Sequence, residues 1–329
     1  MIEDRPVEVV TLGECLMAFV AVRHGSLADA TVFERHVAGA EANVAVGLAR
    51  LGHRTAYIGR VGADGFGSAI VRALRGEGVE VRHVATDDAP TAVMFRERRV
   101  LGAMDVAYHR AGSAGSRLGT ADVDRAVEQG AFEGARWLHL TGITAAISTS
   151  AREALVRACD LAAIRGLTIS LDVNLRRRLW SDEVAGPALR AIATGVDVVF
   201  GSPDELAVLA GVDPSTDLSA TAEAILDLGP RTVVARLGPD GALAVEAGGV
   251  SIPSPAMPVP QVVDPIGAGD AFCAGFIAGR LDGVDLPTTL RMANACGALA
   301  VAALGDQAGS PDRVELGRLL AATGPDTLR

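Results

Sequence analysis

Alternation of helical and strand-like segments is the feature that most restricts how this chain can fold. From residue 121 onward, segments with helical spacing of apolar residues alternate with short apolar runs rich in Val, Ile and Leu. This alternation is typical of a mostly parallel sheet covered by helices on both faces. The predicted helices are 121–130, 149–165, 183–194, 204–210, 221–228, 271–281 and 288–304, and the predicted strands are 136–140, 168–173, 196–200 and 232–237. In such α/β sheets, ligands bind beyond the carboxyl ends of the strands.

The N-terminal third carries the same pattern with one interruption. The predicted strands are 7–12, 55–58 and 79–83, and the predicted helices are 42–51 and 68–76. Residues 91–109 differ, because two short β-like runs surround Gly102 with no helix between them. This predicts a hairpin or a small separate sheet. Its arginines Arg96, Arg98 and Arg99 are interpreted as a solvated edge, since charges on an edge strand block unwanted pairing.

Charge and composition exclude several classes of protein. The formal net charge is −10, which argues against nucleic acid and anionic membrane surfaces as main partners. All 30 basic residues are arginine. Without lysine, the chain can form neither a P-loop nor a Schiff base in their usual form. The N-terminus lacks a signal peptide and no apolar run is long enough to span a bilayer, so the expected location is cytoplasmic.

One segment near the C-terminus combines two carboxylates with a glycine-rich turn. Asp264 and Asp270 flank the Gly267-Ala268-Gly269 turn, which leads into a predicted helix. The free N–H groups and the dipole of a helix N-terminus bind anions such as phosphate. A carboxylate there would repel phosphate, but it could remove a proton from a hydroxyl that attacks the phosphate. Phe272 stands where a dinucleotide fingerprint needs its third glycine.

Three motifs together resemble one family of enzymes. The segment DPIGAGDAFCAGF resembles the C-terminal signature of the ribokinase-like (PfkB) carbohydrate kinases. Residues 39–52 resemble the N-terminal signature of that family, and residues 59–67 resemble its third common motif. The resemblance covers essentially the whole chain. It implies a single domain over residues 1–329, built as a three-layer αβα sandwich with a small β-sheet lid from about 14–37 and 90–112.

The resemblance implies roles for particular residues. Asp270 would be the general base, and the backbone of Gly267, Ala268 and Gly269 would form the anion hole. ATP and Mg²⁺ would be the cofactors, with K⁺ as a possible third. The residues implied for the sugar pocket are Gly39, Ala40, Asn43 and Asp306. Those implied for the nucleotide are Asn174, Ser202, Arg236, Gly238, Gly241, Gly267, Gly269 and Asn294. Glu205 would hold Mg²⁺ through water, and Asp264 would help to hold a monovalent cation.

Four further segments, residues 107–114, 137–143, 170–180 and 305–306, resemble the 2-keto-3-deoxygluconate kinases within this family. In those kinases the residues that match Tyr108, Arg110 and Arg176 contact the substrate. The chemistry agrees, because a guanidinium group binds a carboxylate in a fork and the substrate is a sugar acid. Two positions depart from the pattern: Leu175 and Met94 stand where related sugar-acid kinases often carry Tyr.

Two alternatives are kept open at this stage. A kinase for a neutral sugar such as fructose or ribose would not need Arg110 to bind a carboxylate. A non-catalytic sugar-binding regulator on the same fold would have lost the base or the anion hole, and both are present in this chain. The resemblance also implies a homodimer or a higher homo-oligomer in which the lid forms the interface.

Overall fold

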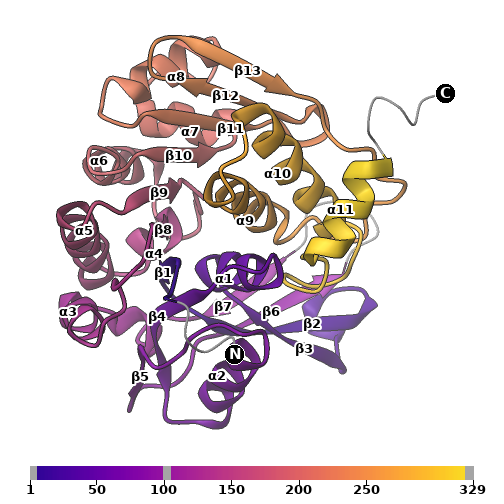
Figure 1. Cartoon of the computed structure of the whole chain (residues 1–329). Coiled ribbons are helices and arrows are strands. Elements are labelled where there is room, and N and C mark those ends of the chain that lie inside the picture. The colour runs from indigo at the N-terminus through magenta and orange to yellow at the C-terminus, as the bar shows by residue number, and fades with distance from the viewer. Residues whose placement is uncertain (1–5, 99–104, 323–329) are drawn as a thin grey trace.

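The computed structural model describes residues 6–98 and 105–322. Within these residues, one sheet of nine strands runs through the molecule in the order β13-β12-β11-β10-β9-β8-β1-β4-β5 (Figure 1). In that order the strands are Val250–Ser254, Ala242–Glu246, Thr232–Arg236, Val198–Gly201, Thr168–Asp172, Trp137–Thr141, Val9–Leu12, Thr55–Gly62 and Val84–Asp87. All neighbours pair in parallel except β11 with β12 and β12 with β13. The predicted mostly parallel sheet is therefore confirmed.

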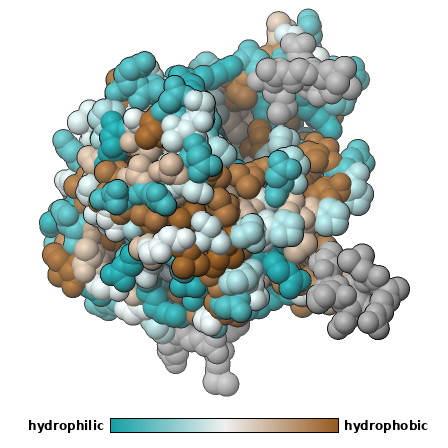
Figure 2. Space-filling model, turned by 90° about the horizontal axis from the view of Figure 1, so that it is seen from above, coloured by the Kyte–Doolittle hydropathy of each residue, from teal (hydrophilic) through white to brown (hydrophobic). Residues whose placement is uncertain are grey.

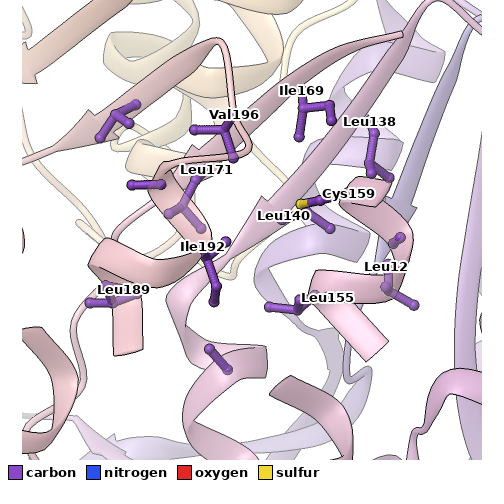
Figure 3. Packing of buried hydrophobic residues seen from close by; sticks show 14 of the residues in the cluster. Leu12, Leu138, Leu140, Leu155, Cys159, Ile169, Leu171, Leu189, Ile192 and Val196 are labelled. Carbon is purple, nitrogen blue, oxygen red and sulfur yellow. The ribbon is translucent and has the colours of Figure 1, made fainter. Parts of the chain in front are cut away.

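Helices cover both faces of this sheet and bury two large apolar clusters. One cluster lies under α3 to α8 and contains Leu12, Leu138, Leu155 and Leu171, as Figure 3 shows from close by. The other lies under α1, α9, α10 and α11. The helices are α1 Ala40–Arg50, α2 Gly65–Gly76, α3 Thr120–Glu128, α4 Gly142–Ile147, α5 Thr149–Ile164, α6 Asp182–Ala193, α7 Pro203–Ala210, α8 Leu218–Leu226, α9 Ala268–Leu281, α10 Leu286–Ala300 and α11 Arg313–Ala322. The fold therefore has three layers: helices, the central sheet and helices, with one apolar cluster on each face of the sheet.

A second sheet forms the lid. Its described strands are arranged in the order β3-β2-β6-β7, with bounds Phe33–Ala38, Leu16–His24, Val93–Arg98 and Val106–His109. β6 and β7 pair antiparallel, as the hairpin prediction requires. Gly102, around which that hairpin was predicted, lies outside the described residues.

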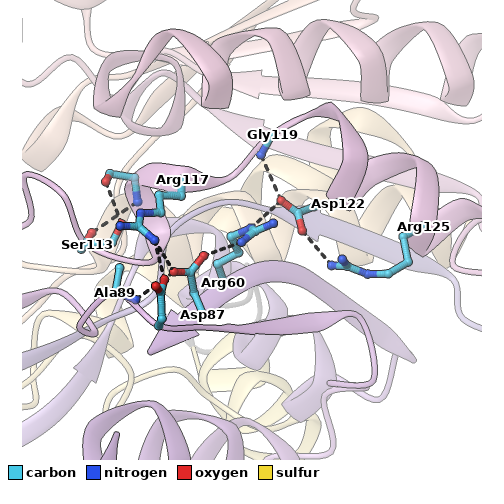
Figure 4. Close-up of polar contacts among 10 residues, drawn as sticks. Arg60, Asp87, Ala89, Ser113, Arg117, Gly119, Asp122 and Arg125 are labelled. Carbon is cyan, nitrogen blue, oxygen red and sulfur yellow. Dashed lines mark hydrogen bonds and ion pairs between the residues drawn. The ribbon is translucent and has the colours of Figure 1, made fainter. Parts of the chain in front are cut away.

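An ion-pair network holds the chain where it returns from the lid to the body (Figure 4). Arg60 on β4 contacts Asp87 at the end of β5 and Asp122 in α3, at 2.5 and 2.7 Å. Arg117, which follows the lid, contacts Asp87 at 2.8 Å. Arg125 binds the other oxygen of Asp122 at 2.7 Å. The base of the lid is therefore fixed to the sheet edge at β4 and β5.

One predicted strand is wrong. Residues 79–83 contribute only an isolated bridge between Ala56 and Glu80, and β5 begins at Val84. The reason is a turn in which the N–H of Val84 donates to the carbonyl of Val81 at 3.1 Å.

No helix of the described residues is long and apolar enough to cross a membrane. On the face seen from above, hydrophilic and hydrophobic residues are interspersed (Figure 2).

Candidate active site

Two cavities meet at the N-terminus of α9. The first, of about 440 Å³, lies between the lid and the carboxyl ends of the strands. The second, of about 820 Å³, extends along α10 and the loop after β13. Arg236, Pro265 and Gly269 line both cavities. A molecule in either cavity would therefore touch the same turn.

The first cavity collects most of the residues that were predicted for the sugar and the chemistry, together with Asn174, which was predicted for the nucleotide. These residues are Gly39, Ala40, Asn43, Tyr108, Arg110, Asn174, Arg176, Gly267, Gly269, Asp270 and Asp306. They come from α1, the lid, the end of β9, the start of α9 and the loop after α10. Met94 of the lid and Leu175 near β9 are both buried, and Met94 lines the cavity.

Asp270 is the third residue of α9 and is buried. Burial raises the pKa of its carboxyl group to about 7 from an ordinary value of 3.8, although a hydrogen bond from Asn43 acts in the opposite direction. Charge on Asp172 and Asp306 raises this pKa further, whereas Arg176 lowers it. A carboxyl group with a pKa near neutrality can accept a proton from a hydroxyl and release it again.

Asn43 holds the Asp270 carboxylate in place. Its Nδ2 donates to Asp270 Oδ2 at 2.7 Å, and both side chains are buried. The Nε2 of Gln307 donates to Asn43 Oδ1 at 3.0 Å, which fixes the amide with its donor toward Asp270. Sequence reasoning did not include Gln307, because a glutamine in a loop has no motif around it.

The turn before α9 is the segment that was predicted to form the anion hole. Gly267 caps the helix with a φ of 81°, and α9 begins at Ala268. The first N–H groups of a helix have no partner within it and are free to bind an anion. Gly269, the second residue of α9, lies against the side chain of Arg236. A Cβ atom added to Gly269 would be only 3.1 Å from Arg236 Nη1. A guanidinium group thus lies beside the predicted anion hole.

Arg236 is anchored by two carboxylates. Its Nη1 and Nη2 bind Asp172 at 2.8 and 2.7 Å, and Nη2 lies 3.4 Å from Glu205 Oε2. Glu205 also accepts from the backbone N–H groups of Ser202 and Leu175, at 2.8 and 2.9 Å. Ser202 caps α7 in return. The predicted basic residue is therefore a guanidinium in a fixed orientation.

The second cavity holds the remaining residues that were predicted for the nucleotide. Ser202, Gly238, Gly241 and Asn294 line it. Ala268, which was predicted for the anion hole, lines it as well, together with Pro258, Val259 and Phe272. Asn294 uses its Nδ2 to bind Ser254 and the carbonyl of Pro255, at 3.0 and 3.1 Å. This amide holds the loop that forms one wall of the cavity.

The lid arginine Arg110 is already paired. Its Nη2 lies 3.0 Å from Glu14 Oε2, and its guanidinium lies 4.7 Å above the ring of Tyr108. Glu14 is buried, and burial raises its pKa although the charge of Arg110 lowers it. Arg176 is exposed and has no ion pair with any described residue. Sequence reasoning missed Glu14, whose position directly after a predicted strand end was the available signal.

The interpretation of Arg96 as a solvated edge residue is wrong. Arg96 is buried, with only 1% of its surface exposed, and its Nη1 and Nη2 bind Asp264 at 3.0 and 2.6 Å. The alternation of side chains along β6 explains this, because Met94 and Arg96 lie on the face toward the cavity. Arg98 is half-buried, and Arg99 lies outside the described residues.

A second buried carboxylate escaped the sequence reading. Glu41, the second residue of α1, accepts hydrogen bonds from Thr141 and Thr144 at 2.7 and 2.5 Å. Burial raises its pKa to about 7. Glu41 faces the sheet rather than the first cavity, so its hydrogen bonds join α1 to the end of β8.

Two cavities that meet at a helix N-terminus, with the buried carboxylate of Asp270 lining the first, are the arrangement expected of a phosphotransferase that acts on a hydroxyl group. The sequence comparison specifies the class. A match to the pfkB family of carbohydrate kinases covers residues 7–313, and the chain belongs to this family. The fold and the enzyme class that the motifs predicted are therefore confirmed.

Relatives of known name cover nearly the whole chain. The chain is 41% identical over 324 residues to a 2-dehydro-3-deoxygluconokinase of Thermoproteus tenax, covering 96% of this chain and 95% of the relative. It is 35% identical over 318 residues to the 2-dehydro-3-deoxygluconokinase of Bacillus subtilis, covering 96% of both. A fructokinase-1 of rice is 33% identical over 327 residues, with 95% and 97% covered.

Solved structures agree with the fold. A PfkB protein from Polaromonas sp. JS666 superposes with a TM-score of 0.83 at 36% identity, covering 94% of this chain and 99% of that one. An E. coli protein described as a candidate ribokinase II was solved in complex with ATP and Mg²⁺. It superposes with a TM-score of 0.87 at 27% identity, covering 96% and 99%.

Proposed function

We propose that this carbohydrate kinase transfers the γ-phosphoryl group of ATP to the terminal hydroxyl of 2-keto-3-deoxygluconate (2-dehydro-3-deoxy-D-gluconate) and forms the 6-phosphate. The observation that carries the proposal is the junction of the two cavities at Gly269 and Arg236, beside Asp270. A sugar in the first cavity and a nucleotide in the second would meet there. The two relatives named 2-dehydro-3-deoxygluconokinase support the choice of sugar acid.

Asp270 acts as the general base in this mechanism. Its carboxylate takes the proton from the terminal hydroxyl as the oxygen forms its bond to the γ-phosphorus and the bond from that phosphorus to the β-γ bridging oxygen breaks. ADP leaves with that oxygen. The hydrogen bond from Asn43 keeps the carboxylate aimed at the hydroxyl, and burial keeps its pKa near 7.

The backbone of Gly267, Ala268 and Gly269 stabilises the charge on the phosphoryl group during transfer. Its donors belong to a helix N-terminus, so they are oriented before the substrate binds. Arg236, held by Asp172, supports the same region with a positive charge. Asn174, Ser202, Gly238, Gly241 and Asn294 would border the nucleotide.

Mg²⁺ fits this site as an ion held mainly by phosphate oxygens and water. Such ions need only one or two protein carboxylates. Glu205 and Asp172 are the carboxylates that line the first cavity beside Arg236, and Glu205 would bind the waters of the ion. When bound, the ion would neutralise charge on the phosphates.

Two arginines would hold the carboxylate of the sugar acid. Arg176 lines the cavity and has no ion pair with a described residue, so its guanidinium is available to a ligand. Arg110 lies across the cavity on the lid and stacks on Tyr108, which fixes the plane of its guanidinium. Gly39, Ala40 and Asp306 would complete the pocket around the hydroxyl groups.

A neutral sugar is the second candidate substrate, and the ion pair between Arg110 and Glu14 favours it. Glu14 balances the charge of Arg110 at 3.0 Å, which reduces the attraction of that guanidinium for another carboxylate. The rice fructokinase is a relative of similar length. Arg176 distinguishes the two candidates, because a sugar acid offers its guanidinium a carboxylate and a neutral sugar does not.

A panel of substrates tests the proposal. ADP release should be measured with 2-keto-3-deoxygluconate, other sugar acids, fructose and ribose, and the phosphorylated carbon should be located by ³¹P and ¹³C NMR. The proposal predicts the highest kcat/KM for 2-keto-3-deoxygluconate and phosphate on its terminal carbon. Turnover of fructose or ribose with none of the sugar acids would establish the second candidate.

We also propose that the lid joins two copies of the chain. Three partly exposed rings lie together on the lid: the centroid of Phe95 is 5.1 Å from Phe19 and 5.6 Å from Phe33. Val32 beside them is 58% exposed. Light scattering should give the mass of a dimer for the wild type and of a monomer for Val32→Asp. Val314→Asp, on equally exposed Val314 of α11, is the control.

A further inference from the structure

A buried ion pair connects the lid to the anion hole. Arg96 lies on lid strand β6 and Asp264 lies three residues before Gly267. The side chains are 2% and 3% exposed, and both guanidinium Nη atoms bind the carboxylate. A forked pair of this kind fixes the orientation of both groups as well as their charge.

The same carboxylate holds the backbone on both sides of the helix N-terminus. Asp264 Oδ1 accepts from the N–H of Ile266, and Oδ2 accepts from the N–H of Gly305, each at 3.2 Å. The loop after α10 then packs on the turn: a Cβ added to Gly267 would lie 2.3 Å from the carbonyl oxygen of Asp306. Any movement of Asp264 would therefore be transmitted to the anion hole.

The motif resemblance predicts a monovalent cation near Asp264, and the residues present do not fit one. Each carboxylate oxygen already accepts one guanidinium nitrogen and one backbone N–H. A buried carboxylate needs a balancing positive charge. Arg96 provides that charge from within the chain.

We propose that Arg96 is a positioning residue that replaces an exchangeable monovalent cation: its guanidinium neutralises Asp264 and holds the anion-hole turn, so phosphoryl transfer by this chain needs no K⁺. The inference rests on the proposed function, because it concerns phosphoryl transfer at the same site. It also makes the lid part of the catalytic arrangement, since β6 carries both Arg96 and the cavity residue Met94.

The test compares cations at constant ionic strength. Turnover of the wild type should be measured in the chlorides of K⁺, Na⁺ and tetramethylammonium, and we expect values within about twofold of one another. Arg96→Ala should lose at least about tenfold in kcat in tetramethylammonium, the scale of a misplaced reacting group. Adding K⁺ or guanidinium ion should restore part of that loss.

Two matched variants separate charge from folding. Arg96→Lys keeps the positive charge and should remain active without K⁺. Arg98→Ala, on the same strand and half-buried, should match the wild type in every salt. Circular dichroism and thermal melts should accompany each variant.

Three results would overturn the inference. The first is a wild type that K⁺ activates about tenfold or more. The second is an Arg96→Ala variant with wild-type turnover in tetramethylammonium. The third is a loss in Arg96→Ala that neither added cation restores and that Arg96→Lys shares. A wild type without turnover on any sugar would instead contradict the proposed function.

Discussion

Asn43 Nδ2 lies 2.7 Å from Asp270 Oδ2, so the first turns of α1 and α9 are joined by a buried hydrogen bond across 227 residues of sequence. Each residue belongs to a different motif. The contact brings a donor from the predicted sugar pocket onto the predicted base. In the proposed mechanism, this contact would link substrate binding to the protonation of Asp270.

The first prediction concerns pH. In the proposed mechanism Asp270 acts as a base only when it is deprotonated, and its pKa is about 7. The value of kcat/KM for the sugar should therefore rise with pH up to about 7 and level off above it. Asn43→Ala removes a donor that lowers this pKa, so the rising limb should move to higher pH. Initial rates between pH 5 and 9 measure the profile of the wild type and its shift in Asn43→Ala.

Glu41 gives the matched control, because its pKa is also about 7. Thr141→Val removes one hydrogen bond that lowers the pKa of Glu41 and does not touch Asp270. If the rise of kcat/KM with pH shifts in Thr141→Val and stays fixed in Asn43→Ala, the titrating group is Glu41.

The second prediction concerns the carboxylate of the substrate. Arg176→Ala should weaken the binding of the sugar acid by about 1.5–3 kcal/mol, the scale of a charged hydrogen bond, which is roughly 10- to 150-fold in KM. Arg110→Ala should have a smaller effect, because Glu14 already neutralises Arg110. The KM for a neutral sugar should change little in both variants.

Arg177 is the control for Arg176. It is the next residue in the same loop and binds Asp182 and Asp204. Arg177→Ala should leave the KM of the sugar acid unchanged. Equal KM values for the wild type, Arg176→Ala and Arg110→Ala would remove both arginines from the substrate site.

The third prediction concerns the anion-hole turn. Gly267 has a φ of 81°, and an added Cβ would collide with the backbone of Asp306. Gly267→Ala should lower the free energy of unfolding by about 2–4 kcal/mol and reduce kcat as well. Urea denaturation measures the first quantity.

Gly283 offers a control with the same backbone conformation. Its φ is 74°, and a Cβ there would meet no atom within 4 Å. Gly283→Ala should lower the free energy of unfolding by only about 1–2 kcal/mol, with no change in kcat. Equal effects of the two substitutions would show that the Asp306 loop does not constrain the turn.

The sequence predicted the elements that carry periodic or motif signals. The helices and parallel strands after residue 121 are regular, and Asp270, Asn43 and the glycine turn lie in motifs. The strand β12 and the edge strand β13 were missed, although Gly248 and Gly249 between them are a hairpin signal. Their short runs are less periodic than the helices.

The ion pairs of the site could not be read from the sequence. Arg96 and Asp264 are 168 residues apart, and no local pattern indicates that a lid strand meets the turn before α9. Glu14 pairs with Arg110 across 96 positions in the same way. Such contacts depend on how two sheets pack, which single-residue properties do not determine.

The fourth prediction concerns stability. The pKa of Asp270 is about 7 in the folded chain and near 3.8 in an unfolded one. Protonated Asp270 therefore stabilises the fold below about pH 4, and this stability is lost as the pH rises through 7. Asp270→Asn should raise the free energy of unfolding at pH 8 by on the order of a few kcal/mol, since one pH unit corresponds to about 1.4 kcal/mol.

At pH 4 the same substitution should change the stability little. The comparison variant is Asp285→Asn, which alters an exposed helix cap whose pKa is lowered by its hydrogen bond to Thr288. That variant should show no gain at pH 8. A pH-independent effect of Asp270→Asn on thermal unfolding would contradict the raised pKa.

The most direct test of the account is the turnover number of Asp270→Asn with ATP and 2-keto-3-deoxygluconate. Asparagine can keep the hydrogen bond from Asn43 but cannot accept the proton of the hydroxyl. The account predicts that kcat falls roughly 10²- to 10⁴-fold, with little change in either KM. A kcat equal to that of the wild type would contradict the role of Asp270 as the general base.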